Sequence, residues 1–432
     1  MYDEIIEDGI RKERERYIES IKDRICFLAS AHHGGDDCEF FQDLKKGSYN
    51  VCFFVRFFRR PRPAREPDAA PDGDRWVVRV PLAPCLAIEP WEKVATEIAT
   101  MQFVASHTTI PVPKVHAYST SREPGAHEVA FYMILEYVQG KTLDELGVNF
   151  KKGTPEHLRN SINSQLADVY IQLSRLKFPA IGRLVPLLNG SVRVGRAPFS
   201  TAMNQYQLEV GGVPDMIENA SKLFERSRAN CENEADARRR LYFLHQFSDL
   251  VRTGWIQSDL DSGPFVLAHG GLQRWNMLFS DDFKLLAVID WEWAQTVPLQ
   301  LFLPPLFLSG SSIWSLGYFY ERCADRLRGF CSVVKKAEKV KHGGEAPFSR
   351  LWRNLSQNGG ILISMALQYP PNIEDAMYGH LNIMLHARIS TRDDRIRQFI
   401  DQDPGRRDLV ARKVATWNLY DAEMKRLGVV KP

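Results

Sequence analysis

The sequence has no apolar run that approaches the roughly eighteen residues needed to cross a bilayer. Its first twenty residues, MYDEIIEDGIRKERERYIES, are charged throughout and lack the apolar core of a secretory leader. The seven cysteines are scattered, odd in number, and form no CxxC pair or His/Cys cluster. This pattern favours free thiols in a reducing compartment. We therefore expect a cytoplasmic protein with no membrane segment.

An excess of charge of one sign is also lacking. The chain has 56 basic and 53 acidic residues, a formal net charge of +3. This balance gives no basis for nucleic acid or an anionic membrane as a partner. The content of hydrophobic residues, 44%, is ample for a folded core. Because 432 residues exceed what one simple core holds, we expect two lobes.

The most informative stretch is 265–298, FVLAHGGLQRWNMLFSDDFKLLAVIDWEWAQTVP. The apolar runs NMLF and LLAVID are separated by turn residues, which predicts a β-hairpin. Asn276 stands at one mouth of this hairpin and Asp290 at the other. Oxygen side chains in this number suit Mg²⁺, which fills the rest of its shell with water and phosphate. The stretch therefore predicts a site for a hard divalent cation.

Upstream, apolar residues at helical spacing predict one amphipathic helix from Ile10 to Leu28, packed on the rest of the protein. Residues 38–58 predict two strands joined by a turn that contains Gly47 and Ser48. Glycine lets backbone amides approach a phosphate closely, although a glycine in a hairpin is often only a turn. Residues 59–74 are rich in proline and predict a solvated loop, with a basic patch as the alternative.

Further on, a strand over residues 75–82 carries Arg79, and a helix over 90–107 carries Glu97. Either the two form an ion pair, or each faces solvent. Residues 127–143 predict an apolar strand, and the chain beyond is mostly helical, with a loop-rich part within 182–262. We thus expect a helical extension over 1–37, a β-rich lobe over 38–138 and a helical lobe over 139–432.

These motifs resemble the aminoglycoside phosphotransferase and choline kinase-like family, relatives of the protein kinases. Members typically carry His-Gly-Asp-Leu, then Asn-Ile-Leu after three residues, and later Ile-Asp-Trp-Glu. This chain has HGGL, NML and IDWE at 269–272, 276–278 and 289–292. Its stretches IPVPKVHAY and VIDWEWAQTVP look like those of fungal members. The resemblance implies an α+β, two-lobed protein kinase-like fold, with a small β-rich N-lobe and a larger, mainly helical C-lobe.

The resemblance also implies a site. ATP would lie between the lobes and Mg²⁺ on Asn276 and Asp290. Arg79, paired with Glu97, would contact the α- and β-phosphates. The backbone of Glu136 and Val138 would meet the adenine, although a buried strand followed by a turn looks similar. The implied activity is transfer of the γ-phosphate to a hydroxyl of an unidentified small molecule.

One position departs from the family pattern: Gly271 stands where the family places its catalytic Asp. Glycine can neither accept the proton of the acceptor hydroxyl nor orient its oxygen. His269 and Glu292 are candidate replacements, but the first is equally a structural histidine and the second a salt-bridge residue. Two hypotheses follow: a phosphotransferase, or a pseudokinase that acts as a nucleotide-binding or scaffold module with a protein partner.

Overall fold

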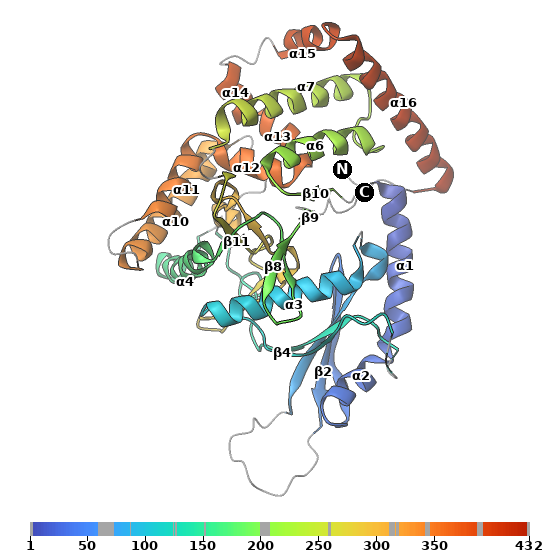
Figure 1. Cartoon of the computed structure of the whole chain (residues 1–432), viewed down its shortest axis with the longest axis vertical. Coiled ribbons are helices and arrows are strands. Elements are labelled where there is room, and N and C mark those ends of the chain that lie inside the picture. The colour runs from blue at the N-terminus through green and yellow to red at the C-terminus, as the bar shows by residue number, and fades with distance from the viewer. Residues whose placement is uncertain are drawn as a thin grey trace, which may run out of the picture.

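The structure is a computed structural model that describes residues 3–429, except 59–72, 87, 124, 126–127, 151–152, 199–207, 258–260, 311–315, 317–318, 342–345 and 387–391. A small lobe built on one β-sheet lies below a larger, mainly helical lobe (Figure 1). The predicted α+β, two-lobed fold is therefore confirmed. Within the described ranges, no helix has both the length and the apolar character that a membrane span requires.

The small lobe is organised by a five-stranded antiparallel sheet of order β1-β2-β3-β5-β4. Its strands are β1 (Cys38–Lys46), β2 (Asn50–Phe57), β3 (Arg75–Pro81), β4 (Val115–Ser119) and β5 (Tyr132–Glu136). Helix α3 (Pro90–His107) crosses one face of this sheet (Figure 1). Val78 and Val80 of β3 point to the face of the sheet opposite α3. Because successive residues of a strand point to alternate faces, Arg79 between them points toward α3.

The extension before the sheet differs from the prediction of a single helix from Ile10 to Leu28. Two helices are present, α1 (Glu4–Lys22) and α2 (Ile25–His32), broken at a polar turn where the Arg24 amide donates to the Ile21 carbonyl at 3.0 Å. The break lets the apolar residues of both helices pack on the sheet. At its other end, α1 reaches the helical lobe, where the Glu4 amide donates to Tyr420 Oη at 2.7 Å.

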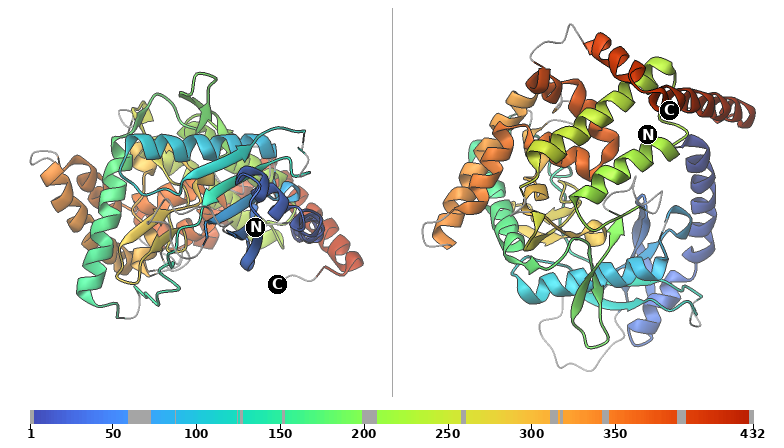
Figure 2. Two further views of the ribbon diagram at one scale, coloured as in Figure 1. Left: turned by 90° about the horizontal axis from the view of Figure 1, so that it is seen from below. Right: turned by 45° about the horizontal axis from the view of Figure 1, so that its top comes forward.

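The helical lobe has one continuous core. Its first helices are α4 (Glu156–Arg175), α6 (Val213–Arg226) and α7 (Glu234–Leu250). The later ones are α10 (Tyr320–Lys341), α11 (Pro347–Gln357), α12 (Gly360–Gln368), α13 (Ile373–Tyr378), α14 (His380–His386), α15 (Arg392–Asp401) and α16 (Pro404–Leu427). Helices α6, α7 and α13 lie together at the end of the molecule away from the sheet, and α16 lies near α1 (Figure 2).

The predicted hairpin of the helical lobe is present as β12 (Met277–Phe279) and β13 (Leu285–Val288), paired antiparallel. Just before it, β11 (Phe265–Ala268) pairs with β14 (Gln295–Val297) and β6 (Lys177–Phe178). The remaining short strands are β7 (Arg183–Pro186), β8 (Val192–Gly195), β9 (Ala197–Pro198) and β10 (Glu209–Val210). These pairings hold the hairpin between the two lobes.

Two expectations about regular structure need correction. The loop-rich part expected within 182–262 contains helix α6 and the β7–β8 hairpin, because Met216, Ala220 and Leu223 form a buried apolar stripe that the sequence analysis overlooked. The long strand expected over 127–143 is only β5, since the chain leaves the sheet at the lobe boundary after Glu136. Most of the proline-rich stretch lies outside the described residues.

Candidate active site

A cavity of about 940 Å³ opens between the small-lobe sheet and the β12–β13 hairpin. The residues that line it include nearly all those predicted from the sequence: Gly47, Ser48, Arg79, Glu136, Val138, Gly271, Asn276 and Asp290. Glu97 is the exception, because it is fully buried behind Arg79. The fold thus brings residues up to some 240 positions apart in the chain to the walls of one cleft.

Arg79 and Glu97 form the predicted ion pair, and the alternative of two solvent-facing side chains is wrong. The Arg79 Nη1 atom lies 2.7 Å from Glu97 Oε1, and both side chains are buried. Burial by itself raises the pKa of Glu97, and the charge of Arg79 offsets only part of this rise. The other end of the guanidinium contacts Asp290. Arg79 therefore links the central strand of the sheet to the hairpin across the cleft.

Asp290 follows β13 in a left-handed backbone conformation, with φ of +68°. Few residues other than glycine adopt this conformation, and strained backbone of this kind clusters at functional sites. Burial alone would raise the pKa of Asp290, but the charge and hydrogen bond of Arg79, with the charge of Lys93, outweigh it and hold this pKa below its ordinary value. The carboxyl group is therefore ionised at neutral pH.

Asn276 ties the hairpin to the loop that precedes it. Its Nδ2 atom donates to the Gly271 carbonyl at 2.8 Å and lies 3.3 Å from Asp290 Oδ2. The backbone carbonyl of Asn276 accepts a hydrogen bond from the Ile289 amide at 3.0 Å. Because the side-chain nitrogen is used inside the protein, the side-chain oxygen is the atom that a cation would meet. An ionised carboxylate and an amide oxygen at adjacent positions fit Mg²⁺.

His269 is a structural residue. It is buried beside Trp291, with the ring centroids 4.5 Å apart and the rings tilted by 49°. Its Nδ1 atom accepts from the Gly271 amide at 3.2 Å, which leaves Nε2 as the donor to the Ile289 carbonyl at 3.0 Å. Burial lowers the pKa of His269 to about 4. A neutral ring with both nitrogens engaged cannot replace the missing base.

Glu292 is also engaged. Its Oε2 atom lies 2.5 Å from Lys93 Nζ and accepts from Asn50 Nδ2 at 2.8 Å, and it is 3.7 Å from Arg79 Nη2. These contacts agree with the salt-bridge interpretation of this residue. Both candidate replacements for the absent Asp therefore serve the framework of the site.

Lys93 and Asn50 were not singled out from the sequence. Lys93 Nζ also lies 3.5 Å from Glu97 Oε2 and donates to Asn50 Oδ1 at 3.0 Å. Its position one helical turn before Glu97 places both side chains on the same face of α3, a signal that could have identified it. Asn50, at the start of β2, had no such signal.

The turn and the lobe boundary complete the walls of the cleft. The Gly47 amide closes its own turn by donating to the Asn50 carbonyl at 2.8 Å. At the boundary, the Glu136 amide donates to the Lys114 carbonyl at 2.8 Å, and the Val138 carbonyl accepts from the Gly140 amide at 2.9 Å. A purine at this edge would therefore have to use the Glu136 carbonyl and the Val138 amide.

The profile of the Phosphotransferase enzyme family matches residues 64–299, more than half of the chain. The chain belongs to this family. The matched residues include Arg79, Gly271, Asn276 and Asp290, which line the cleft.

Individual relatives are distant. Subtelomeric hrmA-associated cluster proteins from two strains of Aspergillus fumigatus are 28% identical over 149 residues, 34% of this chain. The match spans about a quarter of the length of those relatives. Among solved structures, macrolide 2'-phosphotransferase type I is 15% identical, with a TM-score of 0.41 over 82% of this chain and 92% of its own. Spectinomycin phosphotransferase is 12% identical, with a TM-score of 0.35 over 80% of this chain and 98% of its own.

Proposed function

We propose that this phosphotransferase-family chain binds ATP with Mg²⁺ in the 940 Å³ cleft and transfers the γ-phosphate to a hydroxyl of a small molecule. The observation that carries this proposal is the meeting of Arg79, Asn276 and Asp290 at one cleft, with the pKa of Asp290 held low. A guanidinium, an amide and a carboxylate that line one open cleft support binding of a phosphate compound together with a cation.

In this proposal the adenine lies against the strand end at Glu136 and Val138, which offer one carbonyl and one amide. The triphosphate runs toward Arg79, and Asn276 and Asp290 hold the cation. A bound Mg²⁺ would neutralise phosphate charge and help to align the groups for in-line transfer. Arg79 contacts Asp290 in this structure. The phosphates would therefore compete with Asp290 for Arg79, and the cation would compete with Arg79 for Asp290.

A second candidate, a nucleotide-binding module without transfer activity, is favoured by Gly271. His269 and Glu292 are both engaged in the framework, as described above. Loss of a general base costs roughly 10²- to 10⁴-fold in rate. The structure offers a direct test, because a Cβ atom added at Gly271 would lie 3.6 Å from Asn276 Nδ2 and 3.9 Å from His269 Nδ1, which are ordinary contacts.

The experiment measures binding and turnover in the same samples of wild type, Gly271→Asp and Asp290→Asn. Binding is read as the shift of the unfolding temperature with ATP or ADP and Mg²⁺, and turnover as ADP release with a panel of polyols and amino alcohols. At 100 times its Kd, a nucleotide should add about 2.7 kcal/mol to the free energy of unfolding. Asp393→Asn, on the exposed face of α15, is the matched control.

We expect Mg²⁺-dependent stabilisation in wild type and its loss in Asp290→Asn. Turnover by wild type that Asp290→Asn abolishes would establish the phosphotransferase and exclude the inactive module. Turnover that appears only in Gly271→Asp would establish the module instead. The absence of stabilisation by every nucleotide would overturn both proposals.

A further inference from the structure

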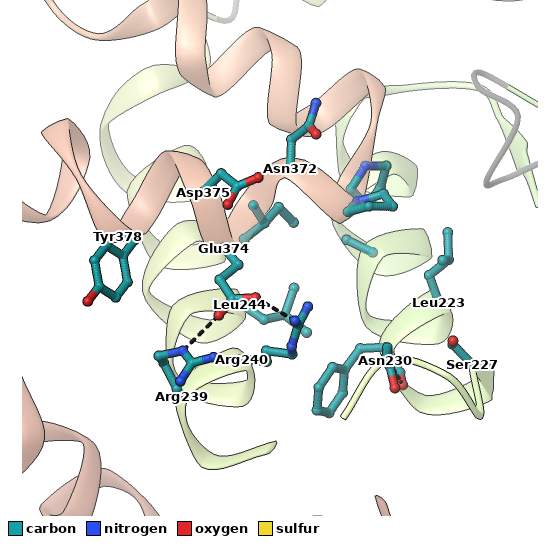
Figure 3. Close-up of a pocket in the computed structure, with 15 residues that line it drawn as sticks. Leu223, Ser227, Asn230, Arg239, Arg240, Leu244, Asn372, Glu374, Asp375 and Tyr378 are labelled. Carbon is teal, nitrogen blue, oxygen red and sulfur yellow. Dashed lines mark hydrogen bonds and ion pairs between the residues drawn. The ribbon is translucent and has the colours of Figure 1, made fainter. Parts of the chain in front are cut away.

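A second cavity, of about 630 Å³, lies in the helical lobe between α6, α7, the turn at 370–372 and α13 (Figure 3). It shares no lining residue with the cleft between the lobes. Its walls are mixed: they include Leu223, Leu244, Ile373 and two prolines, and about half of the lining residues are polar or charged. Small-molecule sites have volumes of this order and combine apolar walls with polar groups that orient the ligand.

At one end of this cavity, two buried polar atoms lack a partner. Ser227 is 2% exposed and Asn230 is 9% exposed, and neither Ser227 Oγ nor Asn230 Oδ1 has a hydrogen-bond partner among the described residues. The rest of each residue is used: Asn230 Nδ2 donates to the Phe224 carbonyl at 2.9 Å, and the Ser227 carbonyl accepts from Lys413. Buried polar atoms in folded proteins are nearly always paired, so these two oxygens are free to accept a hydrogen bond from a bound molecule or from water.

Asp375 lies at the other side of the cavity, near Asn372 and away from Ser227 (Figure 3). No described residue forms an ion pair with Asp375, although two guanidinium groups line the same cavity. Those groups, of Arg239 and Arg240, both bind Glu374, at 2.7 and 2.9 Å. Burial, with the adjacent charge of Glu374, raises the pKa of Asp375, and the charge of Arg240 offsets only part of this rise.

We propose that this cavity is a second small-molecule site and that its ligand is a cationic amphiphile. A hydroxyl or amide of the ligand donates to Ser227 and Asn230, an apolar middle covers Leu223 and Leu244, and an ammonium group lies beside Asp375. The two arginines add no net attraction for an anion, because Glu374 and Asp236 both pair with them and balance their two charges. This site does not depend on nucleotide binding in the cleft.

The test uses three linear probes of equal chain length and saturation-transfer NMR with titration. Aminohexanol carries a hydroxyl and an ammonium at opposite ends, hexylamine lacks the hydroxyl, and hydroxyhexanoate replaces the ammonium with a carboxylate. Wild type is compared with Ser227→Ala and Asp375→Asn. The matched controls are Ser332→Ala and Asp393→Asn, at exposed positions of α10 and α15.

We expect saturable binding of aminohexanol and weaker binding of the other two probes. Ser227→Ala should weaken aminohexanol about two- to tenfold, the effect of one buried hydrogen bond, and should leave hexylamine unchanged. Asp375→Asn should abolish the preference for aminohexanol over hydroxyhexanoate. Both controls should behave as wild type, and ADP with Mg²⁺ should not displace the probe.

Three results would overturn the proposal: no saturable binding of aminohexanol at millimolar concentration, equal binding of all three probes, or full displacement by ADP. Ser227→Ala removes an unpartnered atom and should fold at least as well as wild type. If it fails to fold, Asp375→Asn decides the matter alone, because its half-buried side chain has no intramolecular ion pair to lose.

Discussion

Replacing Lys93 by methionine removes a buried ammonium from the centre of the site while keeping a side chain of similar length. The Nζ atom of Lys93 lies 2.5 Å from Glu292 Oε2 and 3.5 Å from Glu97 Oε2, and it donates to Asn50 Oδ1 at 3.0 Å. The side chain is 6% exposed, so solvent screens these interactions little. We expect a large loss of stability.

The magnitude follows from the charges of the cluster. Two cations, Arg79 and Lys93, face three carboxylates, Glu97, Asp290 and Glu292, so the cluster has a net charge of −1, which becomes −2 in the variant. Removing one partner of a buried pair costs about 3–5 kcal/mol. Because Arg79 and a side-chain amide still contact Glu292, we expect a decrease of about 2–4 kcal/mol in the free energy of unfolding.

The loss of stability in the Lys93→Met variant should depend on pH, and Glu97 determines the direction of this dependence. The pKa of Glu97 is raised in the folded protein, so the folded state binds more protons than the unfolded state above the ordinary value of 4.5. Stability from this group is therefore lost as pH rises, and removing Lys93 raises that pKa further. The difference between wild type and variant should be larger at pH 7.5 than near pH 5.

Calorimetric unfolding at both pH values measures the effect, with Lys336→Met on the exposed face of α10 as the control. For a chain of 432 residues one kcal/mol corresponds to roughly 1 °C, so the variant should unfold about 2–4 °C below wild type at pH 7.5. A shift no larger than that of the control, or a larger shift at pH 5, would refute the electrostatic reasoning.

Two further predictions concern the loop before the hairpin. Gly270→Ala should lower the free energy of unfolding by on the order of 3 kcal/mol or more. The reason is that φ is +75° at this position and an added Cβ would lie 2.0 Å from the Trp293 carbonyl oxygen. A denaturation midpoint equal to that of wild type would contradict this prediction. His269→Gln should reduce acid sensitivity. Since the pKa of His269 is about 4 when folded, its contribution is present above pH 6.5 and is lost as pH falls toward 4, on the order of 3 kcal/mol in all; unchanged pH dependence of unfolding between pH 7 and 4.5 would argue against it.

Local signals account for what the sequence predicted well. Periodicity placed Arg79 on a strand and Glu97 on a helix, and the order of these elements, with the family resemblance, then implied their ion pair. The β12–β13 hairpin followed from its turn residues. In each case the residues that determine the feature are neighbours in the chain.

Features that depend on distant residues were not predicted. Asn50 meets Glu292 only because β2 and the turn after Asp290 approach each other across 242 positions of the chain. The break between α1 and α2 depends on the sheet beneath them, which receives apolar residues from both helices. The cavity beside Ser227 exists because α13 packs on α7, and no pattern within either helix specifies it.

The loop geometry separates the missing carboxylate from the integrity of the site. The bonds that hold this loop run from His269 to Ile289 and from Asn276 to the Gly271 carbonyl, and neither involves a side chain at position 271. Comparing Gly271→Asp with wild type therefore tests the base alone, and a gain of about 10²- to 10⁴-fold is expected if the acceptor brings no base of its own. An acceptor with its own carboxylate or phosphate beside the reacting hydroxyl reverses this expectation, because an Asp at 271 would repel it and slow transfer. The sign of the change would thus identify the chemistry of the acceptor.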